Sequence, residues 1–165
     1  MPVAAFDSST SRYAFELPDA QGRIFSLDSR RSTGPTIVIF FRGHWCPYCR
    51  RYLSKVQAHL PRLRQVCDVT VVAISNEPAH TSAALAKELE LTFPILCDAT
   101  GATVDQFGVR NGFRAAASLV HPSIFIFDDQ LRLQFMSIDR NYKARTTMRT
   151  LLKELEAIAT TPVAR

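Results

Sequence analysis

Cysteine and long apolar runs are both scarce in this chain of 165 residues. Four cysteines are too few for the disulfide framework that stabilises small secreted proteins. No apolar run approaches the ~18 residues that a membrane-spanning helix needs, so we expect no membrane partner. The start of the chain, MPVAAFD, lacks the basic and apolar regions of a secretory signal. These absences together predict a cytoplasmic protein.

Repeats and low-complexity segments are also missing, and the length suits one domain with a full core. We expect a single domain over 1–165, with flexible ends at 1–12 and 160–165. The net charge of +5 comes from scattered basic residues rather than from a stripe interleaved with aromatic ones. The sequence therefore predicts a solvated basic surface and no nucleic-acid partner.

The most informative stretch is RGHWCPYCRR, from Arg42 to Arg51. An apolar run at 36–41, typical of a buried strand, leads into it, and a helical pattern follows it. The apolar residues of that pattern recur at helical spacing: Leu53, Val56, Leu60 and Leu63. Counting back four residues from Leu53 places Cys49 on the same buried face, with Cys46 one turn earlier at the helix entrance. The stretch predicts a strand, a tight turn, a dithiol and a helix.

A helix entrance favours a thiolate at Cys46. Unpaired N–H groups and about +0.5 of a charge stabilise a negative sulfur there. Pro47 suits the first helical turn, where its missing N–H costs nothing. Positions i and i+3 have Cβ atoms about 5–6 Å apart, so a disulfide to Cys49 needs only a small adjustment. We predict that Cys46 attacks and that Cys49 resolves.

The remaining elements can be placed by periodicity and turn signals. Alternation at 13–17 and 23–27 predicts an N-terminal β-hairpin. Further strands are expected at 69–74, 93–96, 121–127 and 131–136, and further helices at 83–91, 102–107 and from 146 onwards. We expect Pro61 to kink or break the dithiol helix. This order matches an α/β thioredoxin-like fold, a central mixed β-sheet flanked by helices, extended by the N-terminal hairpin.

Several segments resemble the peroxiredoxin-like branch of the alkyl hydroperoxide reductase / thiol-specific antioxidant family. They are FFRGHWCPYC at 40–49, AISNE at 73–77, LTFPILCD at 91–98, and parts of 108–109 and 125–128. The resemblance, from about 15 to about 155, implies a thiol peroxidase acting on hydrogen peroxide or organic hydroperoxides. The Cys46 thiolate would attack the peroxide and become a sulfenic acid, and Cys49 would condense with it to a disulfide.

The resemblance also implies partners and a pocket. A thioredoxin- or glutaredoxin-type thiol reductant would reduce the disulfide, no metal, flavin or haem is required, and such redoxins often form homodimers. Thioredoxin-like proteins place a cis-proline opposite the dithiol, and we predict one at Pro122. The expected wall around the dithiol comprises Arg42, Gly43, His44, Trp45, Pro47, Tyr48, His121 and Pro122.

The chain departs from the family's pattern P-x-x-x-T-x-x-C. It has Ile39 in place of the proline and Gly43 in place of the threonine, and His121 and Pro122 stand where an activating arginine is usual. Those groups orient the peroxide oxygens and stabilise the developing charge. The candidates to supply the missing positive charge from nearby loops are Arg42, Arg110, Arg114 and Arg140.

Other interpretations of the dithiol compete with the peroxidase. Cys-Pro-Tyr-Cys is also the dithiol of glutaredoxins, so the alternative is a thioredoxin/glutaredoxin-like protein disulfide oxidoreductase. A zinc site is less favoured, because Cys67 and Cys97 lack the spacing of metal ligands. A third interpretation is a binding module that does not use its dithiol. We expect Cys67 to be a core residue and Cys97 to be a weaker third redox candidate.

Overall fold

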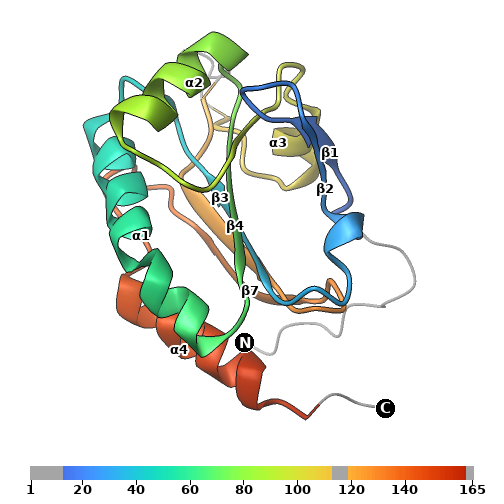
Figure 1. Ribbon diagram of the computed structural model, residues 1–165. Helices are drawn as coiled ribbons and strands as arrows, with labels where there is room; N and C mark the ends of the chain where they lie inside the picture. Colours follow the sequence, from blue (N-terminus) through green and yellow to red (C-terminus); the bar gives the residue numbers. More distant parts are fainter. Residues whose placement is uncertain (1–12, 113–118, 163–165) are drawn as a thin grey trace.

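The computed structural model describes residues 13–112 and 119–162 of the chain (Figure 1). Its centre is a five-stranded mixed sheet in the order β5-β4-β3-β6-β7. The strands are β3 (Thr36–Phe40), β4 (Thr70–Ser75), β5 (Ile95–Cys97), β6 (Ser123–Phe127) and β7 (Leu133–Ile138). β3, β4 and β5 run parallel, whereas β6 is antiparallel to both β3 and β7.

The sheet is covered on both faces (Figure 1). Helices α1 (Pro47–Val66), α2 (Ala79–Glu88) and α4 (Met148–Thr160) pack on one face. The hairpin of β1 (Glu16–Pro18) and β2 (Ile24–Ser26) and the short helix α3 (Ala102–Gln106) cover the other, and a single 3₁₀ turn, η1 (Asp28–Arg30), follows the hairpin. The predicted mixed sheet, flanking helices and N-terminal hairpin are therefore confirmed.

Strand β3 shows why the core has two halves. Ile37, Ile39 and Phe41 face the side of α1, while Val38 and Phe40 face the hairpin side. Alternate side chains of a strand point to opposite faces, so a strand buried on both faces is apolar throughout. Five residues of β3 are buried, and the strand ends where the dithiol loop begins.

The structure contradicts two predictions about proline, a break of the helix at Pro61 and a cis bond before Pro122, whereas a kink at Pro61 stays a prediction. Helix α1 continues through Pro61 to Val66, because Leu60 and Leu63 on either side of the proline are buried in the core. Burial of this face outweighs the one backbone hydrogen bond that the proline removes. The bond before Pro122 is trans, as are all peptide bonds in the described part of the chain. The trans form is the usual one for a bond before proline, and the Pro122 carbonyl accepts a hydrogen bond from the Asp139 N–H at 2.8 Å at the start of β6.

Element ends also differ from the predictions. Helix α2 begins at Ala79, directly after the N-cap Pro78, in agreement with the helix-start signals that the sequence carries at 75–78, but it ends at Glu88 rather than at residue 91. Thr160, the first residue of the flexible end expected at 160–165, is the last residue of α4, and residues 1–12 and 163–165 lie outside the described residues. Within the described ranges, none of the helices is long and apolar enough to span a membrane.

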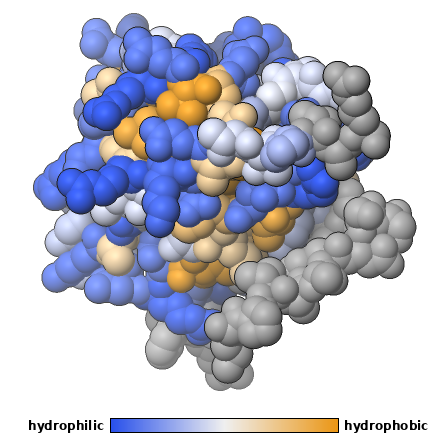
Figure 2. Space-filling view, turned by 90° about the horizontal axis from the view of Figure 1, so that it is seen from below, coloured by the Kyte–Doolittle hydropathy of each residue, from blue (hydrophilic) through white to orange (hydrophobic). Residues whose placement is uncertain are grey.

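Figure 2 views the molecule from below Figure 1, the end at which α1 and α4 finish. A band of hydrophobic residues crosses this end between hydrophilic ones (Figure 2). A groove at the start of β3 is lined by Pro35, Cys67 and Ile158, among others. The dithiol lies at the opposite end of α1, about 30 Å away along a helix of 20 residues.

Candidate active site

The dithiol lies at the junction of β3 and α1, as the sequence predicts. Cys46 is the N-cap of α1, in extended conformation, and its carbonyl accepts the first helical hydrogen bond from the Arg50 N–H at 3.0 Å. Cys49 is one turn further on, on the buried face of the helix. Both residues are almost fully covered, with exposed fractions of 1 %.

The environments of the two thiols differ. Burial alone would raise the pKa of Cys46, but hydrogen bonds from the Cys49 side chain and backbone outweigh it, aided by Arg42 and Arg145. The pKa of Cys46 therefore lies below its ordinary value. Burial raises the pKa of Cys49, and its hydrogen bond to Cys46 raises it further. This asymmetry makes Cys46 the more acidic thiol of the pair in the reduced protein.

Arg42 is stacked between two exposed aromatic rings at the rim of the site. Its guanidinium carbon lies 4.9 Å from the ring centre of Trp45 and 4.8 Å from that of Tyr142. Tyr48 packs edge-on against Tyr142, with ring centres 5.7 Å apart. These cation–π and aromatic contacts hold the arginine beside the dithiol, where its charge lowers the pKa of Cys46. Pro47, the first residue of α1, is exposed.

Glu77 ties down the loop before Cys46. Its carboxylate accepts from the His44 backbone N–H at 2.9 Å and lies 2.5 Å from Nδ1 of the His44 ring. A Cβ atom at Gly43 would come within 2.9 Å of Glu77 Oε1 and 2.5 Å of Trp45 Nε1. The loop is thus packed around a missing side chain, which explains why glycine stands where the family's pattern has threonine. His44 acts here as a partner of Glu77 on an exposed loop.

His121 and Pro122 lie at the head of β6. The register pairs Ser123 with Phe40, so Pro122 lies beside Phe41 at the start of the dithiol loop. Burial lowers the pKa of His121, and the nearby charges of Arg140 and Arg42 lower it further. His121 is therefore on the Arg42 side of the site and favours its neutral form.

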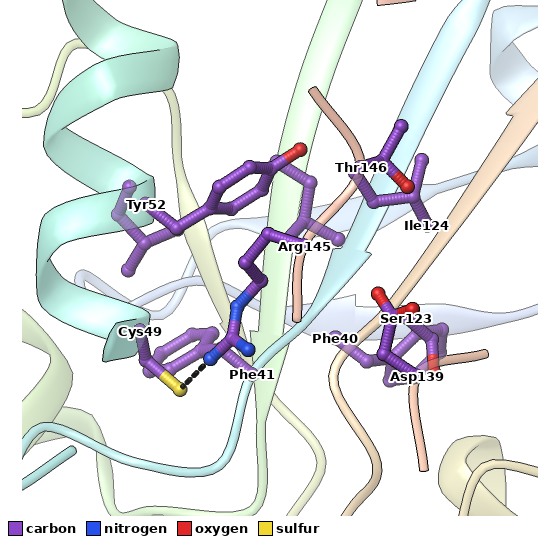
Figure 3. Close-up of a pocket in the computed structure, with 11 residues that line it drawn as sticks. Phe40, Phe41, Cys49, Tyr52, Ser123, Ile124, Asp139, Arg145 and Thr146 are labelled. Carbon is purple, nitrogen blue, oxygen red and sulfur yellow. Dashed lines mark hydrogen bonds between the residues drawn. The ribbon is translucent and has the colours of Figure 1, made fainter. Parts of the chain in front are cut away.

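Sequence reasoning missed Arg145, from the loop between β7 and α4. Its Nη2 donates a hydrogen bond of 3.1 Å to Cys49 Sγ (Figure 3). The residue is 96 positions from Cys49, and no motif marks it. Of the arginines considered, Arg42 lies at the site and Arg110 is paired with Asp105. Arg140 lies near His121, and Arg114 falls outside the described residues.

A narrow cavity lies behind Cys49 (Figure 3). Cys49, Tyr52, Asp139 and Arg145 line it together with residues from the ends of β3 and β6. The Tyr52 hydroxyl is buried, without a hydrogen-bond partner among the described residues, and burial raises its pKa. The Arg145 guanidinium thus reaches the Cys49 sulfur from the cavity, and the Arg42 backbone N–H reaches it from the loop between β3 and α1.

The other cysteines lie away from the dithiol. Cys67 is the C-cap at the far end of α1, and it is half-buried rather than in the core. Cys97 ends β5, with its sulfur 3.8 Å from the Ser82 hydroxyl. Burial raises the pKa of both thiols. In the described ranges, no group of three or more His, Cys, Asp or Glu side chains is arranged to hold a metal ion.

Comparison with known proteins agrees with this geometry. The model of the AhpC/TSA family matches residues 11–136. The chain belongs to the AhpC/TSA family. This is the family of the peroxiredoxins, cysteine-dependent thiol peroxidases, so the predicted resemblance is confirmed. A Mycobacterium tuberculosis protein that carries the name peroxiredoxin is 29% identical over 146 residues, which cover 83% of this chain and 92% of that protein.

A solved structure and a second relative extend the comparison. The crystal structure of peroxidoxin BcpB from Mycobacterium tuberculosis has a TM-score of 0.78 and 26% identity, over 88% of this chain and 93% of that one. The thioredoxin-like fold is therefore confirmed. The thiol-disulfide oxidoreductase ResA of Halalkalibacterium halodurans is 28% identical over 97 residues, covering 58% of this chain and 53% of its own length.

Proposed function

We propose that this AhpC/TSA protein reduces hydrogen peroxide or organic hydroperoxides with Cys46 as the attacking thiolate and Cys49 as the resolving thiol. The observation that carries the proposal is the pairing at the start of α1. Cys46 caps the helix with a lowered pKa, and Cys49 hydrogen-bonds to it from one turn deeper. A nucleophile and a partner in hydrogen-bond contact are what a two-cysteine peroxidase needs.

The reaction has three steps. The Cys46 thiolate attacks one peroxide oxygen, the O–O bond breaks, and water or an alcohol leaves after protonation. The Cys49 sulfur then attacks the sulfenic acid, which forms the disulfide and releases a second water. An external thiol reductant returns both sulfurs to the reduced state. We assign this role to a thioredoxin- or glutaredoxin-type protein of the cytoplasm, and the chain's assembly as a homodimer stays a prediction.

A peroxide reaches Cys46 only when the residues that cover it move, because 1 % of the residue is exposed, and the loop 43–45 directly precedes it in the chain. Trp45 is 49% exposed and the sole tryptophan of the chain, so its fluorescence reports on this loop.

Stopped-flow oxidation of the reduced protein by hydrogen peroxide tests the proposal. We expect Trp45 fluorescence to change at a rate proportional to the peroxide concentration, and one intramolecular disulfide to form per chain.

Cys46→Ser abolishes turnover, because it removes the nucleophile. Cys49→Ser permits one oxidation without efficient recycling by a dithiol. Cys67→Ser and Cys97→Ser are the controls and keep turnover. Full peroxide turnover in Cys46→Ser overturns the assignment.

A second candidate is a protein disulfide oxidoreductase. It is favoured by the likeness of 97 residues of the chain to ResA and by the exposed rings of Trp45 and Tyr142 beside the dithiol. The two functions share Cys46 and differ in its electrophile. Fast insulin reduction combined with slow peroxide consumption would decide for the oxidoreductase.

A further inference from the structure

The sulfur of Cys49 accepts hydrogen bonds from two nitrogen donors on different loops. The backbone N–H of Arg42 donates to it at 3.4 Å, and Nη2 of Arg145 donates at 3.1 Å (Figure 3). Hydrogen bonds from N–H donors, above all from a charged guanidinium, stabilise an anion more than a neutral thiol. The site is therefore built to receive negative charge on the second sulfur as well as on the first.

Arg145 is fixed in place by its own loop. Its Nη1 donates to the carbonyls of Tyr142 and Ala144, each at 2.6 Å, which leaves Nη2 directed at the sulfur. None of the ion pairs found among the described residues includes Arg145. A preorganised guanidinium without a carboxylate partner keeps its full charge for the group it contacts.

We propose that Arg145 is a catalytic residue for the later steps of the cycle, in which it stabilises Cys49 as a thiolate. In resolution, the Cys49 thiolate attacks the Cys46 sulfenic acid, the S–S bond forms and the S–O bond breaks, and hydroxide leaves and is protonated to water. In reduction, the thiolate of the reductant attacks Cys46, the S–S bond breaks, and the electron pair leaves on Cys49 beside Arg145. This inference rests on the proposed function, because the peroxidase reaction produces the Cys46 sulfenic acid that Cys49 attacks.

The same contacts give the order of events. In the reduced protein, burial, the hydrogen bond to Cys46 and the negative charge of Cys46 raise the pKa of Cys49. Oxidation of Cys46 to a sulfenic acid removes that negative charge, whereas the Arg42 N–H and Arg145 remain. Cys49 thus becomes a nucleophile after Cys46 has reacted, which prevents the two thiols from competing for the proton in the resting enzyme.

Single-turnover kinetics of Arg145→Gln test the proposal. We expect the peroxide-independent rate of disulfide formation at neutral pH to fall by about tenfold, because a pKa rise of one unit lowers the thiolate fraction tenfold. The second-order oxidation of Cys46 should fall less, and the sulfenic acid should accumulate and be trapped by dimedone. Arg145→Lys should restore part of the rate. Arg149→Gln, which removes the same charge from an exposed position in the first turn of α4, should leave both rates unchanged.

An unchanged rate and pH profile of disulfide formation in Arg145→Gln overturns the inference, as does an equal loss in both steps. If the wild type does not react with peroxide, the proposed function fails instead. The inference is then decided by the rate at which dithiothreitol reduces the disulfide, which Arg145→Gln should slow.

A titration keeps the test valid if Arg145→Gln does not fold. Cys46→Ser replaces the neighbouring thiolate with a neutral group, as oxidation does. The pH of half-maximal alkylation of Cys49 should be lower in Cys46→Ser than in the wild type. Adding Arg145→Lys to Cys46→Ser replaces the planar guanidinium with an ammonium group of different geometry. The pH of half-maximal alkylation of Cys49 should then rise again. A midpoint equal to that of the wild type in Cys46→Ser contradicts the proposed order of events.

Discussion

Two sulfurs one helical turn apart differ because each has different neighbours. Cys46 accepts the hydrogen bond, lies at the positive end of a 20-residue helix and has Arg42 nearby. Cys49 donates the hydrogen bond and is deeper in the core. Cys49 therefore holds its proton more tightly than Cys46, and the outer sulfur is the first of the pair to ionise.

This difference predicts separate alkylation profiles for the cysteines. Only the thiolate reacts, so a lowered pKa keeps Cys46 reactive to lower pH than an ordinary cysteine, whose pKa is about 8.5. Half-maximal iodoacetamide reaction should fall below that value for Cys46 and above it for Cys67 and Cys97, resolved by peptide mass spectrometry. Restricted access of the reagent to a covered sulfur slows the reaction at every pH and so does not move its midpoint. Cys49→Ala, which removes the hydrogen-bond donor, should raise the Cys46 midpoint. A Cys46 midpoint at or above that of Cys67 contradicts this account.

Residue patterns located the dithiol but not all of its neighbours. Spacing alone placed Cys46 at the helix entrance and Cys49 on its buried face, because both positions follow from helical periodicity. Arg145 is brought to Cys49 by the pairing of β6 with β3 and β7, and long-range pairing leaves no local signal. The close packing of Gly43 against Trp45 and Glu77 likewise depends on the folded structure and has no local signal in the sequence.

At the scale of elements, α1 shows tertiary packing overriding a local breaker. The sequence places a strand, dithiol and helix correctly, and Pro61 suggests an end to the helix. The buried residues of α1 continue past Pro61 to Leu63, and this face packs into the core formed with α4. The low helix propensity of proline is therefore a weak predictor of a helix end when the apolar face of the helix continues on both sides of it.

Pro61→Ala should therefore stabilise the protein. An interior proline costs about 3 kcal/mol relative to alanine in a helix, while the more flexible unfolded chain returns about 1 kcal/mol. We expect the free energy of unfolding to rise by about 1–3 kcal/mol in urea denaturation, with peroxidase activity unchanged. Arg62→Ala, at the exposed neighbouring position, is the control and should stay within about 0.5 kcal/mol of the wild type. A less stable Pro61→Ala would mean that the proline fits a local bend of α1.

At the scale of the whole molecule, a positive net charge and two arginines at the dithiol favour the approach of an anion. The chain carries a net charge of +5, and Arg42 and Arg145 act directly on the two sulfurs. Two acidic side chains near the loop are engaged in ion pairs, Glu77 with His44 and Glu88 with Arg50. An anionic reagent therefore meets a favourable field on its way to Cys46, and a neutral one does not.

Salt should remove this advantage. The screening length falls from about 30 Å at ~0.01 M to about 10 Å at ~0.1 M, so the field of the whole molecule acts only at low ionic strength. The measured quantity is the ratio of two rates of Cys46 alkylation, by the anion iodoacetate and by the neutral iodoacetamide. We expect this ratio to fall several-fold as the ionic strength rises from ~0.01 M to ~0.1 M and above. Cys67 beside Asp68 is the internal control, and its ratio should change little because the carboxylate opposes the net charge. Equal salt dependence at the two cysteines would show that the positive field is not focused at the dithiol, and that Arg42 and Arg145 act on the sulfurs only at contact distance.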